Sequence, residues 1–240
     1  MNEYLNANQR HWDAVTPFHE RSALYDVAGF KAGRSSLDAI ELEAIGDVAG
    51  KSLLHLQCHL GMDTLSWARL GARVTGVDFS HEAISLARSL SAETAIPADV
   101  VESNLYDLPN NLDGQLDIVF TSYGCMCWLP DLRGWAETAA HFLAPVGTFY
   151  LVEDHPPAEA FDHSPQALEP RVAQQYFHTE QPVQNESQGS YADRNADITD
   201  ITHQWAHPMG EIVTAIADTE TRIEFVHEFP VCCWQRFPFI

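Results

Sequence analysis

The chain has very little lysine. Its 240 residues include 34 aspartates and glutamates against 13 lysines and arginines, which gives a formal net charge of −21. The only lysines are Lys31 and Lys51. A surface this negative repels phosphate backbones and anionic membranes. The composition therefore argues against nucleic-acid and membrane partners and favours a small-molecule partner. A local basic groove would still be compatible with this overall negative charge.

Long apolar runs and leader sequences are also missing. No stretch of eighteen apolar residues occurs, and the first residues, MNEYLNANQRHWD, contain neither a basic leader nor an apolar segment. A membrane-spanning helix needs about 20 mostly apolar residues. The sequence therefore predicts a soluble, cytoplasmic protein.

Paired cysteines are absent. The five cysteines are odd in number, and none belongs to a Cys-x-x-Cys pair of the kind that zinc sites usually show. The sequence therefore predicts no metal site, and reduced thiols suit an intracellular protein.

The most informative segment comprises residues 51–80, KSLLHLQCHLGMDTLSWARLGARVTGVDFS. The apolar run at 53–56 is typical of a parallel strand that is buried on both faces. A turn and a helix follow, and Gly71 stands where a left-handed helix cap is usual. Residues 73–77 then predict a second strand. Asp78 follows at its carboxyl end, the edge where open parallel sheets bind ligands.

Asp78 has the position of a ribose ligand. A carboxylate about 20 residues beyond such a turn can accept hydrogen bonds from two adjacent ribose hydroxyls. Phe79 could lie against an adenine ring. Alternatively, Asp78 and Ser80 cap a helix that begins near His81, and the two roles are compatible.

These motifs resemble the class I S-adenosylmethionine-dependent methyltransferases. The family's first motif is an acidic-led strand that runs into a Gly-x-Gly-x-Gly turn. His55 stands in the place of the acidic residue, Gln57 and His59 stand in the first two glycine places, and Gly61 keeps the third. The resemblance covers most of the chain and implies S-adenosylmethionine as cofactor. Within this turn it also places Cys58 at the cofactor.

The two replaced glycines favour one cofactor over another. Gln57 and His59 would adopt a positive φ only at a cost of about 1 kcal/mol or more, so we expect the turn to differ from the family's standard one. The Gln57 amide and the His59 ring would then bind the methionyl carboxylate or ammonium. A nicotinamide dinucleotide needs Gly-x-Gly-x-x-Gly, and the glycine places of that motif hold Gln57, His59 and Met62.

Later residues are placed by the same resemblance. Asn104 takes the place of an aspartate that meets the adenine amino group, with Leu105 beside it, although a turn-forming role of Asn104 fits almost as well. Residues 116–122 predict a fourth strand. The resemblance puts Ser122, Tyr123 and Gly124, at its end, against the sulfonium and the substrate.

A general base is needed only if the acceptor must lose a proton, and histidine suits that role near neutrality. The strand predicted at 147–153 places His155 over the pocket as the candidate catalytic residue. The next candidates after it are His59, His203 and His207. Because the chain contains twelve histidines, most of them must have other roles.

We expect a single α/β domain over residues 1–240, with a doubly wound, mostly parallel sheet and helices on both faces. Residues 1–50 would form a helical lid, 51–155 the cofactor-binding core, 156–202 a substrate-side insertion, and 203–240 a closing helix and strand. In the lid, Trp12, Phe18, Tyr25 and Phe30 either cover the pocket or anchor the helical arm. Tyr176, Tyr191 and Trp205 are candidate substrate contacts.

The family's seventh, antiparallel strand has no counterpart in this sequence. Residues 222–229 predict a sixth strand, which we expect to lie close to the strand at 147–153 or to pair with another chain. The apolar residues 234–240 fit either a dimer contact or a truncated product, so a homodimer is possible.

The sequence therefore predicts methyl transfer from S-adenosylmethionine to an oxygen or nitrogen atom of a small molecule. The alternative is a non-catalytic module that binds S-adenosylmethionine or a nucleoside, suggested by the replaced glycines and the missing strand.

Overall fold

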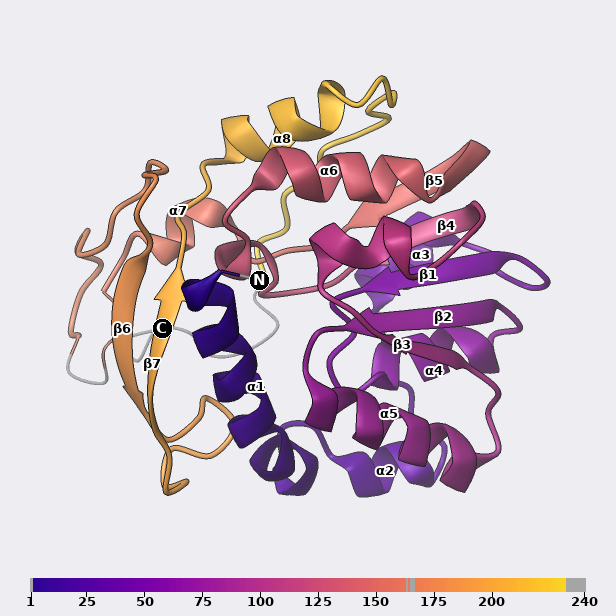
Figure 1. The fold of residues 1–240 in the computed structure, drawn as a ribbon, viewed down its shortest axis with the longest axis horizontal. Helices are drawn as coiled ribbons and strands as arrows, with labels where there is room; N and C mark the ends of the chain where they lie inside the picture. Colours follow the sequence, from indigo (N-terminus) through magenta and orange to yellow (C-terminus); the bar gives the residue numbers. More distant parts are fainter. Residues whose placement is uncertain (1, 163, 165–166, 232–240) are drawn as a thin grey trace.

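A five-stranded, wholly parallel sheet forms the centre of the molecule (Figure 1). The computed structural model describes residues 2–162, 164 and 167–231. The strand order is β3-β2-β1-β4-β5, and the order reverses between β1 and β4, which is where such sheets bind ligands. The strands are β1 (Ser52–Leu56), β2 (Arg73–Asp78), β3 (Asp99–Glu102), β4 (Leu116–Thr121) and β5 (Leu143–Leu151).

Helices cover both faces of this sheet, because successive residues of a buried strand point to opposite sides. On one face Leu53 and Phe120 pack with Trp67 of α4. On the other, Leu54 packs with Trp135 of α6. The doubly wound α/β fold is thus confirmed. Its helices are α2 (Val27–Lys31), α3 (Ala39–Ile45), α4 (Met62–Arg69), α5 (His81–Thr94), α6 (Leu132–His141), α7 (Pro156–Glu159) and α8 (Met209–Ala217), with the short 3₁₀ helices η1 (Leu105–Asn110) and η2 (Met126–Trp128).

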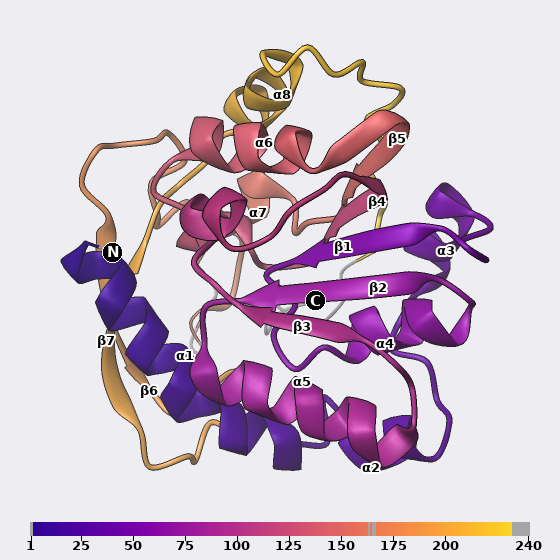
Figure 2. The same ribbon diagram turned by 45° about the vertical axis from the view of Figure 1, so that its right-hand side comes forward.

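A hairpin and the first helix lie against the carboxyl edge of the sheet. The hairpin joins β6 (Val183–Gln188) to β7 (Thr199–Gln204) and begins within the segment expected to form the insertion. Helix α1 (Glu3–Arg21) lies between β7 and the sheet (Figures 1 and 2). The Asn8 side chain donates to the His203 carbonyl at 2.7 Å and accepts from the His203 N–H at 2.8 Å. Helix α1 therefore links the hairpin to the sheet.

The sixth strand expected at residues 222–229 does not form. In the part of the chain that the structure describes, the main sheet ends at β5, and residues 222–229 have no strand hydrogen bonds. This segment does lie close to β5, since the Phe225 and Tyr150 rings are 6.4 Å apart. Residues 232–240 lie outside the described residues, so the homodimer stays a prediction. None of the described helices is both long enough and apolar enough to cross a membrane.

Val146 is strained in a bulge of β5. The pairing of β4 with β5 shifts register between Leu116 and Ile118, and opposite this shift Val146 adopts a φ of 62° with its side chain fully exposed. This conformation is energetically unfavourable for a β-branched residue, and the exposed side chain gains no packing that would offset the cost.

Val146→Asn should therefore raise the free energy of unfolding by about 1 kcal/mol, because asparagine tolerates the left-handed region. The measurement is urea unfolding. The control Val226→Asn changes an exposed valine that has no positive φ, and it should leave stability nearly unchanged. If Val146→Asn and Val226→Asn changed the free energy of unfolding equally, Val146 would not be strained.

Candidate functional site

The turn after β1 keeps a left-handed backbone at every glycine position of the motif. The φ angles are 58° at Gln57, 47° at His59 and 72° at Gly61. Gln57 and His59 thus adopt the positive φ that glycine would adopt at no steric cost. A Cβ on Gly61 would lie 2.8 Å from the Cβ of Ala87 in α5. Close packing of the turn against α5 thus requires glycine at position 61, the third glycine place of the motif, and not at positions 57 and 59.

The Asp78 carboxylate holds this turn. One of its oxygens accepts from the His59 backbone N–H at 2.9 Å, and the other accepts from the Ser80 N–H at 2.9 Å. Ser80 in turn caps α5, because its hydroxyl oxygen accepts from the Ala83 N–H at 3.1 Å. Asp78 is 8% exposed, and burial raises the pKa of its carboxyl to about 6 against the lowering effect of these N–H groups.

A cavity of about 130 Å³ lies at this edge of the sheet. Its walls come from the turn, the ends of β2 and β3, the loop after β4, and α1. The predicted cofactor residues that line it are Gln57, His59, Asp78, Phe79, Asn104, Leu105 and Tyr123.

Three predicted cofactor residues do not line this cavity. Cys58 is buried, and Gly61 packs against α5. The Ser122 hydroxyl donates to the Asp63 carboxylate at 3.2 Å and lies 3.1 Å from Nε2 of buried His55. Burial lowers the pKa of His55 to about 3, so its ring is a neutral bridge between strands and helix. Ser122 thus belongs to the packing beneath the cavity.

Gln57 and Asn104 differ in whether their side-chain amide oxygens already accept a hydrogen bond within the protein. The Asn104 amide oxygen already accepts from the Tyr106 N–H at 2.9 Å, which is the turn role weighed for it. The Gln57 amide nitrogen donates to the Cys125 carbonyl at 3.3 Å, but its Oε1 is buried and has no partner in the described structure. An orphaned acceptor in a cavity wall is costly unless a ligand satisfies it. Gln57 therefore fits a cationic donor such as an ammonium group.

Aromatic side chains from α1, from the segment between α1 and α2, and from the hairpin turn close the cavity. Trp12, Tyr25 and Tyr191 line it, and the Tyr25 and Tyr191 hydroxyls are hydrogen-bonded. His19 connects the turn after β1 to the hairpin turn. Its Nδ1 is 2.8 Å from His59 Nε2, and its Nε2 is 2.5 Å from the Ser190 hydroxyl. Of the two nitrogens of His59, Nε2 is thus already engaged within the protein.

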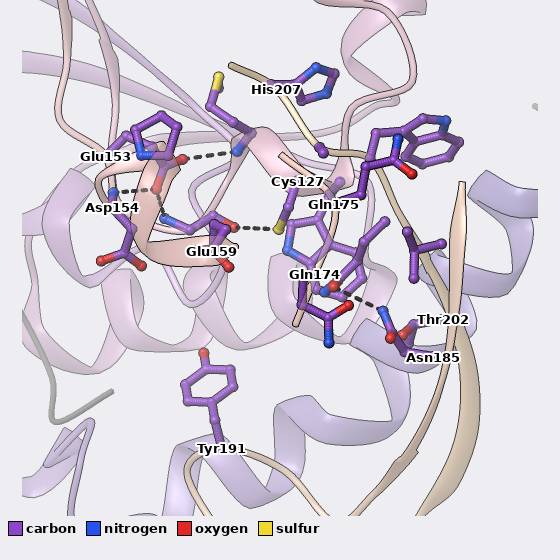
Figure 3. Close-up of a pocket in the computed structure, with 18 of the residues that line it drawn as sticks. Cys127, Glu153, Asp154, Glu159, Gln174, Gln175, Asn185, Tyr191, Thr202 and His207 are labelled. Atoms are coloured by element: carbon purple, nitrogen blue, oxygen red, sulfur yellow. Dashed lines mark hydrogen bonds between the residues drawn. The ribbon is translucent and has the colours of Figure 1, made fainter. Parts of the chain in front are cut away.

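A second cavity, of about 740 Å³, adjoins the first (Figure 3). The two share Gly124, Trp128 and Tyr191 as lining residues. The larger one is bounded by the hairpin and by the segment around α7. The aromatic candidates named from the sequence, Tyr176, Tyr191 and Trp205, all line it. Its other lining groups include the amides of Gln174, Gln175, Asn185, Gln188 and Gln204, the carboxylates of Glu153, Asp154 and Glu159, and the guanidinium of Arg194.

Glu153 fixes the loop between the two cavities. Its carboxylate accepts backbone N–H groups from Gly124, from Cys125 at 2.8 Å and from Met126 at 2.9 Å, and also from Asp154 at 2.7 Å. Burial nevertheless raises its pKa to about 7. Sequence reasoning missed this residue, because only tertiary structure brings the end of β5 to the loop after β4.

His155 lines neither of the two cavities. Its neighbours Asp154 and Pro156 line the large cavity, but His155 does not, and its Nε2 contacts the exposed Glu228 instead. His11 lines the large cavity, and its Nδ1 is 3.3 Å from the Asp200 carboxylate. No local sequence signal marks His11, since α1 and β7 meet only in the folded chain.

The parallel sheet, with an acidic residue holding a turn beside a cavity at its carboxyl edge, defines a Rossmann-like domain. Residues 53–147 match the model of a family described as a methyltransferase domain. This match and the fold support the assignment of residues 53–147 to the class I S-adenosylmethionine-dependent methyltransferase domains. S-adenosylmethionine is the cofactor of that class.

Curated relatives agree with this assignment. A ubiquinone biosynthesis O-methyltransferase of Xanthomonas oryzae pv. oryzae (strain PXO99A) is 28% identical over 151 residues, which cover 63% of this chain and 59% of the relative. The corresponding protein of Xanthomonas euvesicatoria pv. vesicatoria (strain 85-10) is 29% identical over 130 residues, covering 53% and 54%. The chain thus spans less than two thirds of the length of these relatives.

Solved structures share the fold. The DhpI-SAH complex has a TM-score of 0.58 at 18% identity, over 90% of this chain and 87% of that one. A structure that concerns the conversion of a disulfide bond into a thioacetal group during echinomycin biosynthesis has a TM-score of 0.51 at 21% identity, over 89% and 100%.

The raised pKa of Glu153 predicts a pH-dependent contribution to stability. Between its ordinary value of 4.5 and about 7, the native state binds more protons than the unfolded state, so this contribution falls as the pH rises. The stability of the wild type relative to Glu153→Gln should therefore decrease by roughly 1–3 kcal/mol across this window. Urea unfolding at several pH values measures the difference, and a difference that does not vary with pH would refute the assignment.

Proposed function

We propose that this chain transfers the methyl group of S-adenosylmethionine to an oxygen or nitrogen atom of a small molecule in the large cavity. The observation that carries the proposal is that the two cavities meet at Gly124, Trp128 and Tyr191. The sulfonium supplies both the methyl group and a good leaving group. The protein must then align the acceptor with the methyl group and exclude water.

The residues of the small cavity fit this cofactor. Asp78 can accept the two ribose hydroxyls with the lone pairs that its backbone contacts leave, and Phe79 offers a face for adenine. The Gln57 Oε1, buried without a partner in the described structure, suits the methionyl ammonium. The second acceptor capacity of the Asn104 amide oxygen suits the adenine amino group.

Cofactor binding requires the covering side chains to move. The small cavity measures about 130 Å³, whereas ligand pockets usually hold roughly 300 Å³ or more. Trp12, Tyr25 and Tyr191 line this cavity and are the side chains that would have to move. We infer that α1 and the hairpin turn separate to admit the cofactor and close again over it.

A small-molecule acceptor fits the large cavity better than a nucleic acid does. A volume of about 740 Å³ lies within the range of small-molecule sites, roughly 300–1,000 Å³. The net charge of −21 repels polyanions. The curated relatives are named as O-methyltransferases, which favours oxygen over nitrogen as the acceptor atom.

His11 is the base we assign for an acceptor that must lose a proton, in place of His155. It lines the large cavity, and its ring lies nearly parallel to that of Trp128, with the centroids 6.1 Å apart. The Asp200 carboxylate at its Nδ1 orients the ring and leaves Nε2 to accept a proton.

The first experiment is calorimetric titration with S-adenosylmethionine, S-adenosylhomocysteine and NAD, at a pH near 7 and again near 5. The first two ligands should bind and NAD should not. Affinity should rise about tenfold as the pH rises through about 6, because the ribose hydroxyls need the ionised Asp78 as acceptor. Asp78→Asn should weaken binding and remove this pH dependence.

A methyl-transfer screen against small phenols, hydroxy acids and amines completes this test. Formation of S-adenosylhomocysteine with an acceptor supports the enzyme. Binding without turnover across the screen would support the non-catalytic module instead, and absence of binding would reject both.

Gln57→Gly isolates the side chain of Gln57, because glycine keeps the left-handed backbone of the turn. Loss of an acceptor for a charged donor costs about 1.5–3 kcal/mol, so S-adenosylmethionine affinity should fall at least about tenfold. Ala95→Gly is the matched control, since Ala95 also has a positive φ, of 55°, at the end of α5. Equal affinities in the two variants would show that Gln57 does not contact the cofactor.

A further inference from the structure

Two histidines and a glutamate converge where the insertion meets the start of α8. His178, His207 and Glu211 each offer one ligand atom, and these atoms lie within 4.8 Å of one another. His207 also lines the large cavity (Figure 3). The methyl-transfer proposal does not use this cluster.

His207 presents an unused nitrogen inside the protein. Its Nε2 is 2.7 Å from the Leu129 carbonyl oxygen. A carbonyl can only accept, so Nε2 carries the proton and Nδ1 of the neutral ring has a lone pair. His207 is 7% exposed, and its Nδ1 is buried without any hydrogen-bond partner in the described structure. Such an atom is unfavourable unless something binds it.

His178 is oriented in the same manner. Its Nδ1 lies 3.3 Å from the Ala206 carbonyl oxygen, which leaves Nε2 as the free acceptor. Metal-binding histidines almost always donate their other ring N–H to a carbonyl or carboxylate, which fixes the tautomer and the ring. Both histidines of the cluster have this arrangement, with their rings 5.2 Å apart.

Glu211 supplies a third ligand of opposite charge. It lies in the first turn of α8 and is exposed, so its side chain can rotate toward the histidines. Ligands at about 2.1 Å around a tetrahedral ion lie roughly 3.4 Å from one another. Rotation of the flexible Glu211 carboxylate can bring its oxygens closer to the two histidine nitrogens, which already lie within 4.8 Å of it.

We propose that His178, His207 and Glu211 bind a divalent cation of the zinc class in the wall of the large cavity. Two imidazoles and one carboxylate suit zinc better than magnesium or calcium, which prefer oxygen ligands. Three protein ligands leave a fourth position for water or for an oxygen or nitrogen atom of a bound molecule. The bound ion would thus help to hold the acceptor in place.

The sequence did not reveal this site because its expectation rested on paired cysteines. His178 and His207 lie 29 residues apart, on opposite sides of the β6–β7 hairpin. Only the spacing His207-x-x-x-Glu211 is local, and by itself it is not a metal signature.

The test titrates chelator-treated protein with Zn²⁺ by calorimetry and with Co²⁺ by visible absorption, which reports coordination geometry. One equivalent should bind with micromolar or tighter affinity. His178→Ala should weaken binding about 100-fold and Glu211→Gln about tenfold. Neither variant removes a fully buried side chain, so the test does not depend on His207→Ala folding.

His141→Ala, which removes a histidine at the end of α6 outside the cluster, is the matched control and should bind as the wild type does. Absence of stoichiometric binding would overturn the proposal. So would binding that all three variants retain equally, since the ion would then bind elsewhere. These readouts need no methyl transfer, so failure of the metal site and failure of the proposed enzyme activity are distinguishable.

Discussion

The hydrogen bond from the His59 backbone N–H to the Asp78 carboxylate is the contact on which the proposed cofactor site depends. It joins the turn after β1 to the end of β2 at 2.9 Å and stabilises a left-handed turn that lacks two of the family's glycines. Hydrogen bonds from backbone N–H groups offset part of the free-energy cost of burying the Asp78 carboxylate. As a result, the cavity keeps its shape while the side chains at positions 57 and 59 add chemistry that glycines cannot provide.

Helix α1 then completes the site by binding to two separate elements. Asp13 accepts a hydrogen bond from the Ser80 hydroxyl at 2.7 Å, and the Gln9 amide donates to the Phe79 carbonyl at 2.6 Å. On its other side, Asn8 pairs with the backbone of His203 in β7. Opening the small cavity must therefore break contacts on at least one side of α1. Polar contacts of this kind cost less to break than a packed apolar interface, which suits an element that has to move.

The large cavity is built by segments that have no regular place in the parallel sheet. Glu153 organises the loop at its junction with the small cavity through backbone N–H groups, and the hairpin supplies much of its polar wall. On the proposed function, the insertion would determine specificity for the acceptor, whereas the edge of the sheet would bind the cofactor. The proposed metal cluster would join the insertion to α8, since His178 belongs to the insertion and Glu211 to α8.

The sequence by itself determined the sheet, its helices and several of the residues that line the small cavity. Buried parallel strands, a helix cap at Ser80 and an acid at Asp78 are local patterns, because hydrophobic periodicity and capping depend on neighbouring residues. Only the tertiary structure decided the roles of His11, Glu153 and His207, whose partners Asp200, Gly124 and Leu129 are distant in sequence. It also decided that residues 222–229 form no strand, although their apolar pattern favours one. Strand formation needs a partner with matching register, and that is a property of the folded chain and not of the segment.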